Sequence, residues 1–123
     1  MIELVSDLGG GKTTFVRGLA KGIGSSDLVS SPTFTLSNVY KGTKLTINHF
    51  DFYRLAKPGI MREELAEVLT DPQAVTVIEW ADIVHDVLPQ ERLTMHITAT
   101  GEASRRYNLT GGPGLQYLTE GLT

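Results

Sequence analysis

The nine residues SDLGGGKTT, at positions 6–14, set the class of fold that this chain can adopt. They follow an apolar run from Met1 to Val5 that is typical of a buried strand, and they lead into a helical pattern from Lys12 to Ile23. Consecutive glycines can adopt positive φ angles and turn their N–H groups toward the point that the N-terminus of the next helix also faces. The stretch therefore predicts a phosphate-binding loop, in which Lys12 reaches the terminal phosphates and the Thr13 hydroxyl binds a magnesium ion.

The loop matches the common pattern G-x-x-x-x-G-K-[ST] only in its second half. Gly11, Lys12 and Thr13 fit the pattern literally, whereas Ser6 stands where the first glycine is expected. A serine adds a Cβ atom to a tight turn, so we expect Ser6 to tighten or distort the loop. The alternative interpretation is a glycine-rich turn with a structural role alone.

Length and composition restrict the chain further. Its 123 residues suffice for one hydrophobic core, so residues 1–123 are expected to form a single domain. The chain has no cysteine, which excludes disulfides and thiolate metal sites, and no apolar run approaches the roughly 20 residues that span a bilayer. Its net charge of −3 differs from the basic surfaces that bind nucleic acids through their phosphates. We expect a cytoplasmic protein that contacts neither membranes nor DNA.

Helical and strand patterns alternate after the loop. Phe15, Leu19 and Ile23 recur at helical spacing, and Gly18 among them is expected to pack closely against the sheet. The other predicted elements are a hairpin of Phe34 to Tyr40 with Leu45 to Tyr53, a helix from Met61 to Leu69, a buried central strand from Ala74 to Ile78, a hairpin of Leu93 to Thr100 with Arg105 to Thr110, and a short closing helix with Leu115, Leu118 and Leu122 on one face. This order predicts an α/β fold whose mixed sheet contains antiparallel hairpins.

Four motifs lie in order along the chain, and together they are far more specific than the loop alone. They are DLGGGKTTF at residues 7–15, SPTF at 31–34, HFDFYRL at 49–55 and IEW at 78–80. The series resembles the bacterial TsaE (YjeE) family, the small P-loop ATPases of threonylcarbamoyladenosine tRNA modification. The resemblance runs from the first strand to Trp80 and implies a P-loop NTPase-like core of three layers. The chain departs from the family in Ser6 and in lacking the helix and strand that usually precede the loop.

The resemblance also implies which residues form the site. Thr33 would sense the γ-phosphate or its metal ion, and Trp80 would lie beside the site. Asp51 and Glu79 would be the acidic partners of Mg²⁺ and of the attacking water, with Glu79 and Thr13 as the metal ligands. The phosphates of ATP would be held by Gly9, Gly10, Gly11, Lys12, Thr13 and Thr14.

Elementary chemistry agrees with a catalytic role for Lys12 and Glu79. Phosphoryl transfer is catalysed mainly by positioning and by neutralising charge with lysine, Mg²⁺ and an oriented water. A carboxylate at the end of the strand beside the loop's own strand, as expected for Glu79, can reach that metal. The alternatives are a strand-end cap for Glu79, an ion pair with Arg54 for Asp51, and an ordinary turn for Thr33.

The remaining ionisable residues give weaker signals. His49, His85 and His96 lack the spacing of metal ligands, so each is expected to be structural or exposed. Several arginines could stabilise the charge of a transition state, and the sequence singles out none of Arg17, Arg54, Arg62, Arg105 and Arg106.

The function that the resemblance implies is an ATPase that works with two partner proteins, TsaB and TsaD. TsaD would transfer the threonylcarbamoyl group to the adenosine beside the anticodon, so this chain would contact tRNA only indirectly. The runner-up is a nucleotide-gated binding module with negligible hydrolysis. A small-molecule kinase is disfavoured because no arginine-rich lid is visible, and a GTPase because the sequence contains no N-K-x-D segment.

Overall fold

A computed structural model describes residues 1–6, 11–32, 36–53, 59–118 and 120. The segments at 7–10 and 33–35 lie outside the described residues, so Gly9, Gly10 and Thr33 are not placed. The elements are β1 (Ile2–Val5), α1 (Lys12–Gly22), β2 (Ser37–Lys41), β3 (Thr46–Asp51), α2 (Gly59–Leu69), β4 (Ala74–Glu79), the 3-10 helix η1 (Ala81–Val87), β5 (Leu93–Ala99), β6 (Arg105–Thr110) and the 3-10 helix η2 (Pro113–Leu118).

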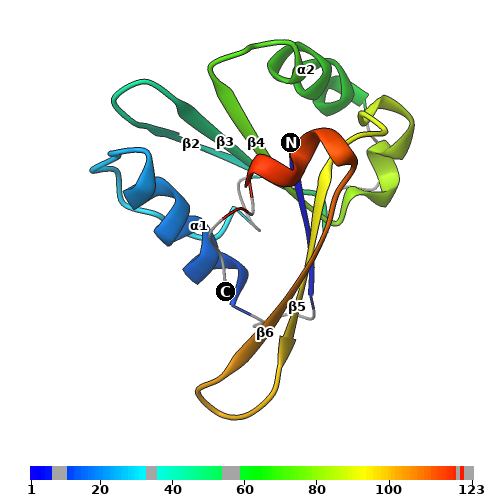
Figure 1. The fold of residues 1–123 in the computed structure, drawn as a ribbon. Coiled ribbons are helices and arrows are strands. Elements are labelled where there is room, and N and C mark those ends of the chain that lie inside the picture. Colours follow the sequence, from blue (N-terminus) through cyan, green and yellow to red (C-terminus); the bar gives the residue numbers. More distant parts are fainter. Residues whose placement is uncertain (7–10, 33–35, 54–58, 119, 121–123) are drawn as a thin grey trace.

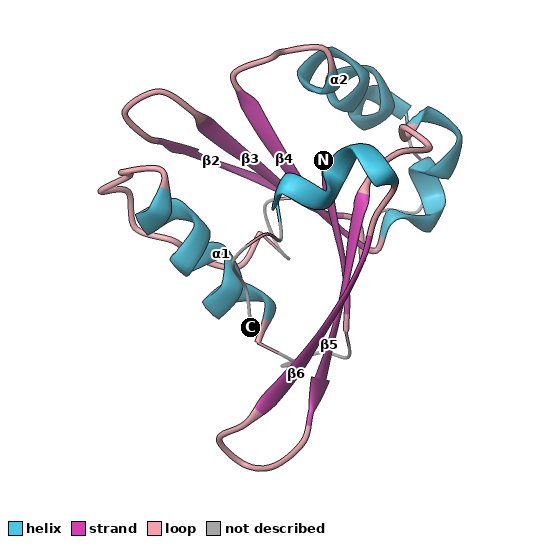
Figure 2. Ribbon diagram, in the orientation of Figure 1, coloured by secondary structure: helices cyan, strands magenta, loops and turns pink. Residues whose placement is uncertain are grey.

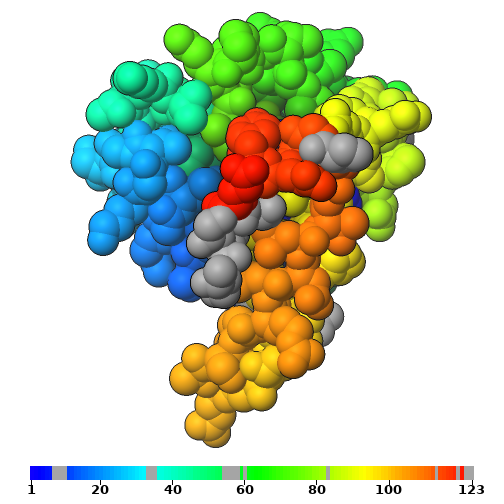
Figure 3. Space-filling view, viewed as in Figure 1, coloured from blue at the N-terminus to red at the C-terminus, as the bar shows by residue number. Residues whose placement is uncertain are grey.

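The strands form one mixed sheet in the order β2-β3-β4-β1-β5-β6 (Figures 1 and 2). β1 lies inside the sheet and is parallel to both of its neighbours, β4 and β5. Two antiparallel hairpins, β2–β3 and β5–β6, form the two ends of the sheet. The tip of the second hairpin projects from the body of the molecule in the space-filling view (Figure 3). The predicted α/β fold with antiparallel hairpins is confirmed.

Helices cover both faces of the sheet, which makes three layers (Figure 1). On one face, Val16 and Ala20 of α1 are buried against Leu4, Ile47 and Val77. Phe15, Leu19 and Ile23, whose spacing predicted this helix, flank the contact and are only partly buried.

On the opposite face, Leu65 of α2 and Val84 of η1 are buried against Phe50 and Ile78. Burying an aliphatic side chain of this size contributes about 1.5–3 kcal/mol. The two apolar clusters thus fix the helical layers to the sheet and hold the carboxyl ends of β1, β3 and β4 together.

One sequence prediction was wrong, and one element was missed. Gly18 is exposed, and a Cβ atom added to it would meet no atom of the described residues within 4 Å, so close packing against the sheet does not explain this glycine. The predicted closing helix is found as the 3-10 helix η2, which contains Leu115 and Leu118, whereas Leu122 lies outside the described residues. η1 was not predicted, because its seven residues include a kink at Val84 and show no regular helical spacing.

No helix among the described residues is both long and apolar enough to cross a lipid bilayer.

Candidate functional site

Gly11, the last glycine of the loop, comes directly before α1. Gly11 has a φ of 98°, a left-handed conformation that side chains disfavour, and it is the N-cap of α1. Its carbonyl accepts the first hydrogen bond of the helix, from the Phe15 N–H, at 3.1 Å. The first turn of α1 contains no acidic residue, so its N–H groups and the positive end of the helix dipole favour an anion.

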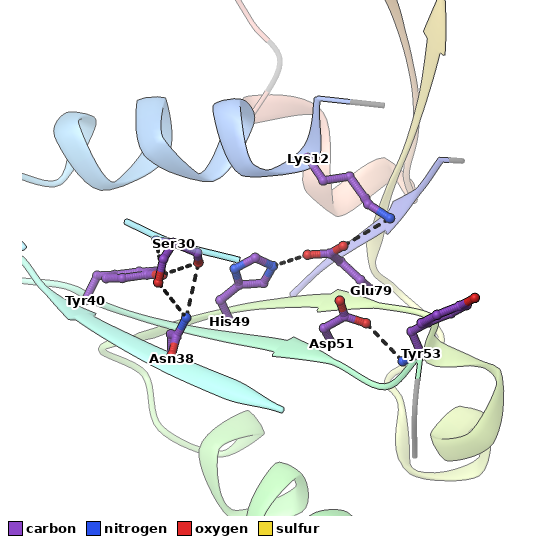
Figure 4. A network of polar contacts seen from close by, with 8 residues as sticks. All are labelled: Lys12, Ser30, Asn38, Tyr40, His49, Asp51, Tyr53 and Glu79. Atoms are coloured by element: carbon purple, nitrogen blue, oxygen red, sulfur yellow. Dashed lines mark hydrogen bonds and ion pairs between the residues drawn. The ribbon is translucent and has the colours of Figure 1, made fainter. Parts of the chain in front are cut away.

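Lys12 points from the first turn of α1 to Glu79, at the carboxyl end of β4 (Figure 4). The side chain is almost buried, with 8% of the residue exposed, and its Nζ lies 3.1 Å from Oε1 of Glu79. The same nitrogen lies 5.5 Å from the centre of the Trp80 ring. The ammonium is thus held by a carboxylate and an aromatic face.

The register of the sheet explains why two predicted acidic residues lie together. Glu79 pairs with Leu4 of β1 on one side and with Asp51 of β3 on the other. Side chains in register on neighbouring strands share a face, and Leu4 belongs to the apolar cluster beneath α1. Asp51 and Glu79 therefore both face the layer that contains Lys12, at the carboxyl ends of their strands.

His49 joins the same cluster. It lies two residues before Asp51 on β3, is completely buried, and its Nε2 lies 2.5 Å from Oε2 of Glu79. Its buried environment fits the structural role expected for it, but sequence reasoning did not foresee the contact with Glu79. The alternation of Ile47, His49 and Asp51 on one face was the available signal. His85 and His96 are exposed, as expected.

The two contacts of Glu79 keep its carboxylate ionised. Burial acts to raise the pKa of Glu79, but the hydrogen bond with His49 and the charge and hydrogen bond of Lys12 outweigh burial and lower the pKa below its ordinary value. A buried carboxylate that stays charged can bind a cation or accept a proton from water.

Asp51 and Trp80 complete the cluster. Asp51 is buried, and its Oδ1 accepts a hydrogen bond of 2.9 Å from the Tyr53 N–H. Trp80 has a φ of 57°, which is an outlier for a bulky side chain, and its ring is 5.0 Å from that of Tyr53. Strained residues of this kind persist where their surroundings force them, often at binding sites.

Comparison with known proteins identifies the family. Residues 1–107 match the family model described as "Threonylcarbamoyl adenosine biosynthesis protein TsaE". The chain belongs to the TsaE family.

Members of the TsaE family from distant bacteria align along most of the chain. A tRNA threonylcarbamoyladenosine biosynthesis protein TsaE from Bacillus subtilis is 37% identical over 128 residues, which cover all of this chain and 77% of that protein. The Treponema pallidum protein of the same name is 38% identical over 105 residues, which cover 85% and 77% respectively. The crystal structure of Bacillus subtilis YdiB superposes with a TM-score of 0.77 at 35% identity, over 97% of this chain and 73% of that one.

A magnesium ion fits the donor set of this TsaE family member. Mg²⁺ prefers oxygen ligands and in nucleotide sites takes one or two from the protein and others from phosphates. Thr13, Asp51 and Glu79 offer a hydroxyl and two carboxylates, whereas the described residues contain no group of three or more acidic, histidine or cysteine ligands that would hold a metal alone.

The structure separates the candidate arginines. Arg105 Nε lies 3.8 Å from the position that a Cβ on Gly11 would occupy, and a pocket of about 150 Å³ lies between this loop residue, Thr14 and the β5–β6 hairpin. Arg62 instead pairs with Asp86, with Nη2 and Oδ1 3.2 Å apart. Arg54, which was considered as a partner of Asp51, lies outside the described residues.

A larger groove of about 680 Å³ lies between β6 and η2, and it does not contain the acidic and basic residues of the site. Among its described lining residues are Tyr107, Leu109 and Leu115, and none is a carboxylate, lysine or arginine. The groove therefore lacks the charges that phosphoryl-transfer chemistry requires.

Proposed function

We propose that this chain binds Mg²⁺·ATP at residues 9–14 and hydrolyses it as the ATPase component of tRNA threonylcarbamoyladenosine biosynthesis. The observation that carries the proposal is the ion pair between Lys12 and Glu79. Lys12 lies at the start of the helix after the loop, and Glu79 lies at the end of β4, which pairs with β1. A lysine and a carboxylate at the mouth of a glycine-rich loop are the groups that phosphoryl transfer to water needs.

In this proposal each residue has a defined task. Lys12 leaves Glu79 and binds the terminal phosphates, whose charge it neutralises, while the N–H groups of the loop and of Thr14 bind the remaining phosphate oxygens. Thr13, with Glu79, would hold Mg²⁺, which supplies further charge neutralisation when bound. Asp51 would accept hydrogen bonds from the water around that cation, and Trp80 would cover the lysine side chain. Thr33 would sense the γ-phosphate.

The partners proposed for this activity are the TsaB and TsaD proteins, in the cytoplasm. The names of the family and of the curated relatives refer to threonylcarbamoyladenosine biosynthesis. The net charge of −3 disfavours direct binding to a tRNA backbone, so the contact with tRNA would be made through the partners.

A second candidate is a module in which ATP changes the surface offered to a partner and is hardly hydrolysed. One observation favours it, since both oxygens of Glu79 already have partners, Lys12 and His49. Hydrolysis would require at least one of these contacts to open.

Turnover of ATP distinguishes the two candidates. We would measure phosphate release by the chain reconstituted with TsaB and TsaD, and compare Glu79→Gln with Glu64→Gln, an exposed carboxylate on α2. A group that orients or deprotonates the attacking water contributes about 10²–10⁴-fold, so Glu79→Gln should lose at least a hundredfold and Glu64→Gln nothing. Unchanged turnover in Glu79→Gln would contradict hydrolysis through Glu79, and negligible turnover by every variant, wild type included, would favour the gated module.

A further inference from the structure

The two partners of Glu79 differ in how firmly each is held. Lys12 contacts Oε1 through a flexible four-carbon chain, and it lies in the first turn of α1 beside the loop. His49 contacts Oε2 from the middle of β3, an interior strand, with a rigid ring that has no exposed surface. Lys12 can swing toward a phosphate by rotating its own side chain, whereas the ring of His49 is enclosed in the core of the fold.

We propose that His49 is the positioning residue of Glu79: it tethers Oε2 permanently and leaves Oε1 as the only oxygen that is released when Lys12 moves to the phosphates. This inference rests on the proposed function. If the tether holds, Oε1 of Glu79 is the oxygen that faces the metal ion or the water, and His49 is the side chain that decides this.

The contact with Glu79 determines which ring nitrogen of His49 carries a hydrogen. An ionised carboxylate only accepts hydrogen bonds, so Nε2 of His49 must carry the hydrogen and donate it to Oε2. The other nitrogen, Nδ1, is buried and has no hydrogen-bond partner among the described residues. A hydrogen on Nδ1 would therefore lack an acceptor in the part of the chain that the structure describes, so the arrangement fits a ring with its hydrogen on Nε2.

Two substitutions test the tether. His49→Gln keeps an N–H donor at roughly the reach of Nε2, whereas His49→Leu fills a similar volume without a donor. His96→Gln, on the exposed side of β5, is the matched control. Thermal melts establish that each variant folds before its activity is compared.

Loss of a hydrogen-bonded residue behind a metal ligand typically costs 10–100-fold in metal affinity or activity. His49→Leu should therefore lose 10–100-fold in the kcat for ATP with TsaB and TsaD, and most of the gain in ATP affinity that Mg²⁺ provides. Its affinity for ATP without Mg²⁺ should stay within twofold of wild type, and His49→Gln should recover most of both losses. A residue that only fills space would not separate Leu from Gln in this way. Equal values for folded His49→Leu and wild type would overturn the proposal.

A measurement on the wild-type, nucleotide-free protein tests the tether without any variant. Long-range ¹H–¹⁵N NMR spectra report which ring nitrogen carries the hydrogen, and we expect Nε2 for His49, before and after addition of Mg²⁺·ATP. A hydrogen on Nδ1 alone would contradict the tether even if His49→Leu does not fold. If wild type binds no ATP, or Glu79→Gln keeps full turnover, the proposed function fails, whereas a full effect of Glu79→Gln with none of His49→Leu rejects only the tether.

Discussion

Replacing Lys12 by methionine should destabilise the nucleotide-free protein, because it leaves the Glu79 carboxylate buried with one partner fewer. The two charges are 3.1 Å apart and their side chains are 9% and 4% exposed. With an effective dielectric constant of about 20, their attraction is about 5 kcal/mol. The desolvation of both ions offsets part of this, and His49 still holds Oε2 in the variant. We therefore expect a loss at the lower end of the range for broken buried pairs, about 3 kcal/mol.

Urea denaturation at pH 7 measures this loss. With a slope of about 2 kcal/mol per M, a change of about 3 kcal/mol lowers the midpoint by about 1.5 M. Arg62→Met is the matched control, because Arg62 and Asp86 are 3.2 Å apart but 42% and 62% exposed. An exposed pair contributes about 0–1 kcal/mol, so this midpoint should move by less than about 0.5 M. Equal shifts in Lys12→Met and Arg62→Met would refute the reasoning.

The double variant Lys12→Met with Glu79→Gln separates lost attraction from lost packing. Replacing both members of a buried ion pair is often nearly neutral, so the double variant should be more stable than Lys12→Met alone. Strictly additive losses would show that the two charges are not coupled in the folded protein.

Three further predictions follow from the same structure. The stability that Glu79 contributes is present above its ordinary pKa of 4.5 and is lost as the pH falls through its lower folded-state pKa. Urea midpoints measured between pH 7 and 3 should therefore decline less steeply in Glu79→Gln than in wild type. Arg105→Ala should weaken Mg²⁺·ATP binding in calorimetry about fivefold, the equivalent of about 1 kcal/mol for an exposed charge, while its neighbour Arg106→Ala should not. Leu65→Ala, on the buried face of α2, should lower the free energy of unfolding measured in urea by about 2–5 kcal/mol and leave ATP affinity unchanged. A changed affinity would show that this face of the sheet is coupled to the site.

Local patterns predicted the elements that place the site. The alternation in residues 45–53 and the continuous apolar run from Ala74 both indicate strands, and both were found. Because Glu79 ends a buried strand and the loop begins at the end of another, their proximity followed once the two strands were neighbours. Periodicity indicates which face of the sheet a residue occupies, and it is enough to place Asp51 on the face that α1 covers.

Features that depend on long-range register could not be predicted. The contact between His49 and Glu79 joins residues 30 positions apart and exists only because β3 and β4 pair with His49 opposite Val77. The left-handed conformation of Trp80 is imposed by the turn into η1, which has no sequence pattern of its own. Gly18 led to a wrong prediction because a glycine inside a helix indicates close packing only if a neighbour approaches it, and none of the residues in the described ranges does.

The most direct test of the central claim is a calorimetric titration of the purified chain with ATP, with and without Mg²⁺, alongside Lys12→Ala. If residues 9–14 form a phosphate-binding loop that recruits Lys12 from Glu79, wild type binds ATP more tightly with Mg²⁺, and Lys12→Ala loses most of that affinity. Binding that is equally strong in folded Lys12→Ala, or that is insensitive to Mg²⁺, would contradict the account.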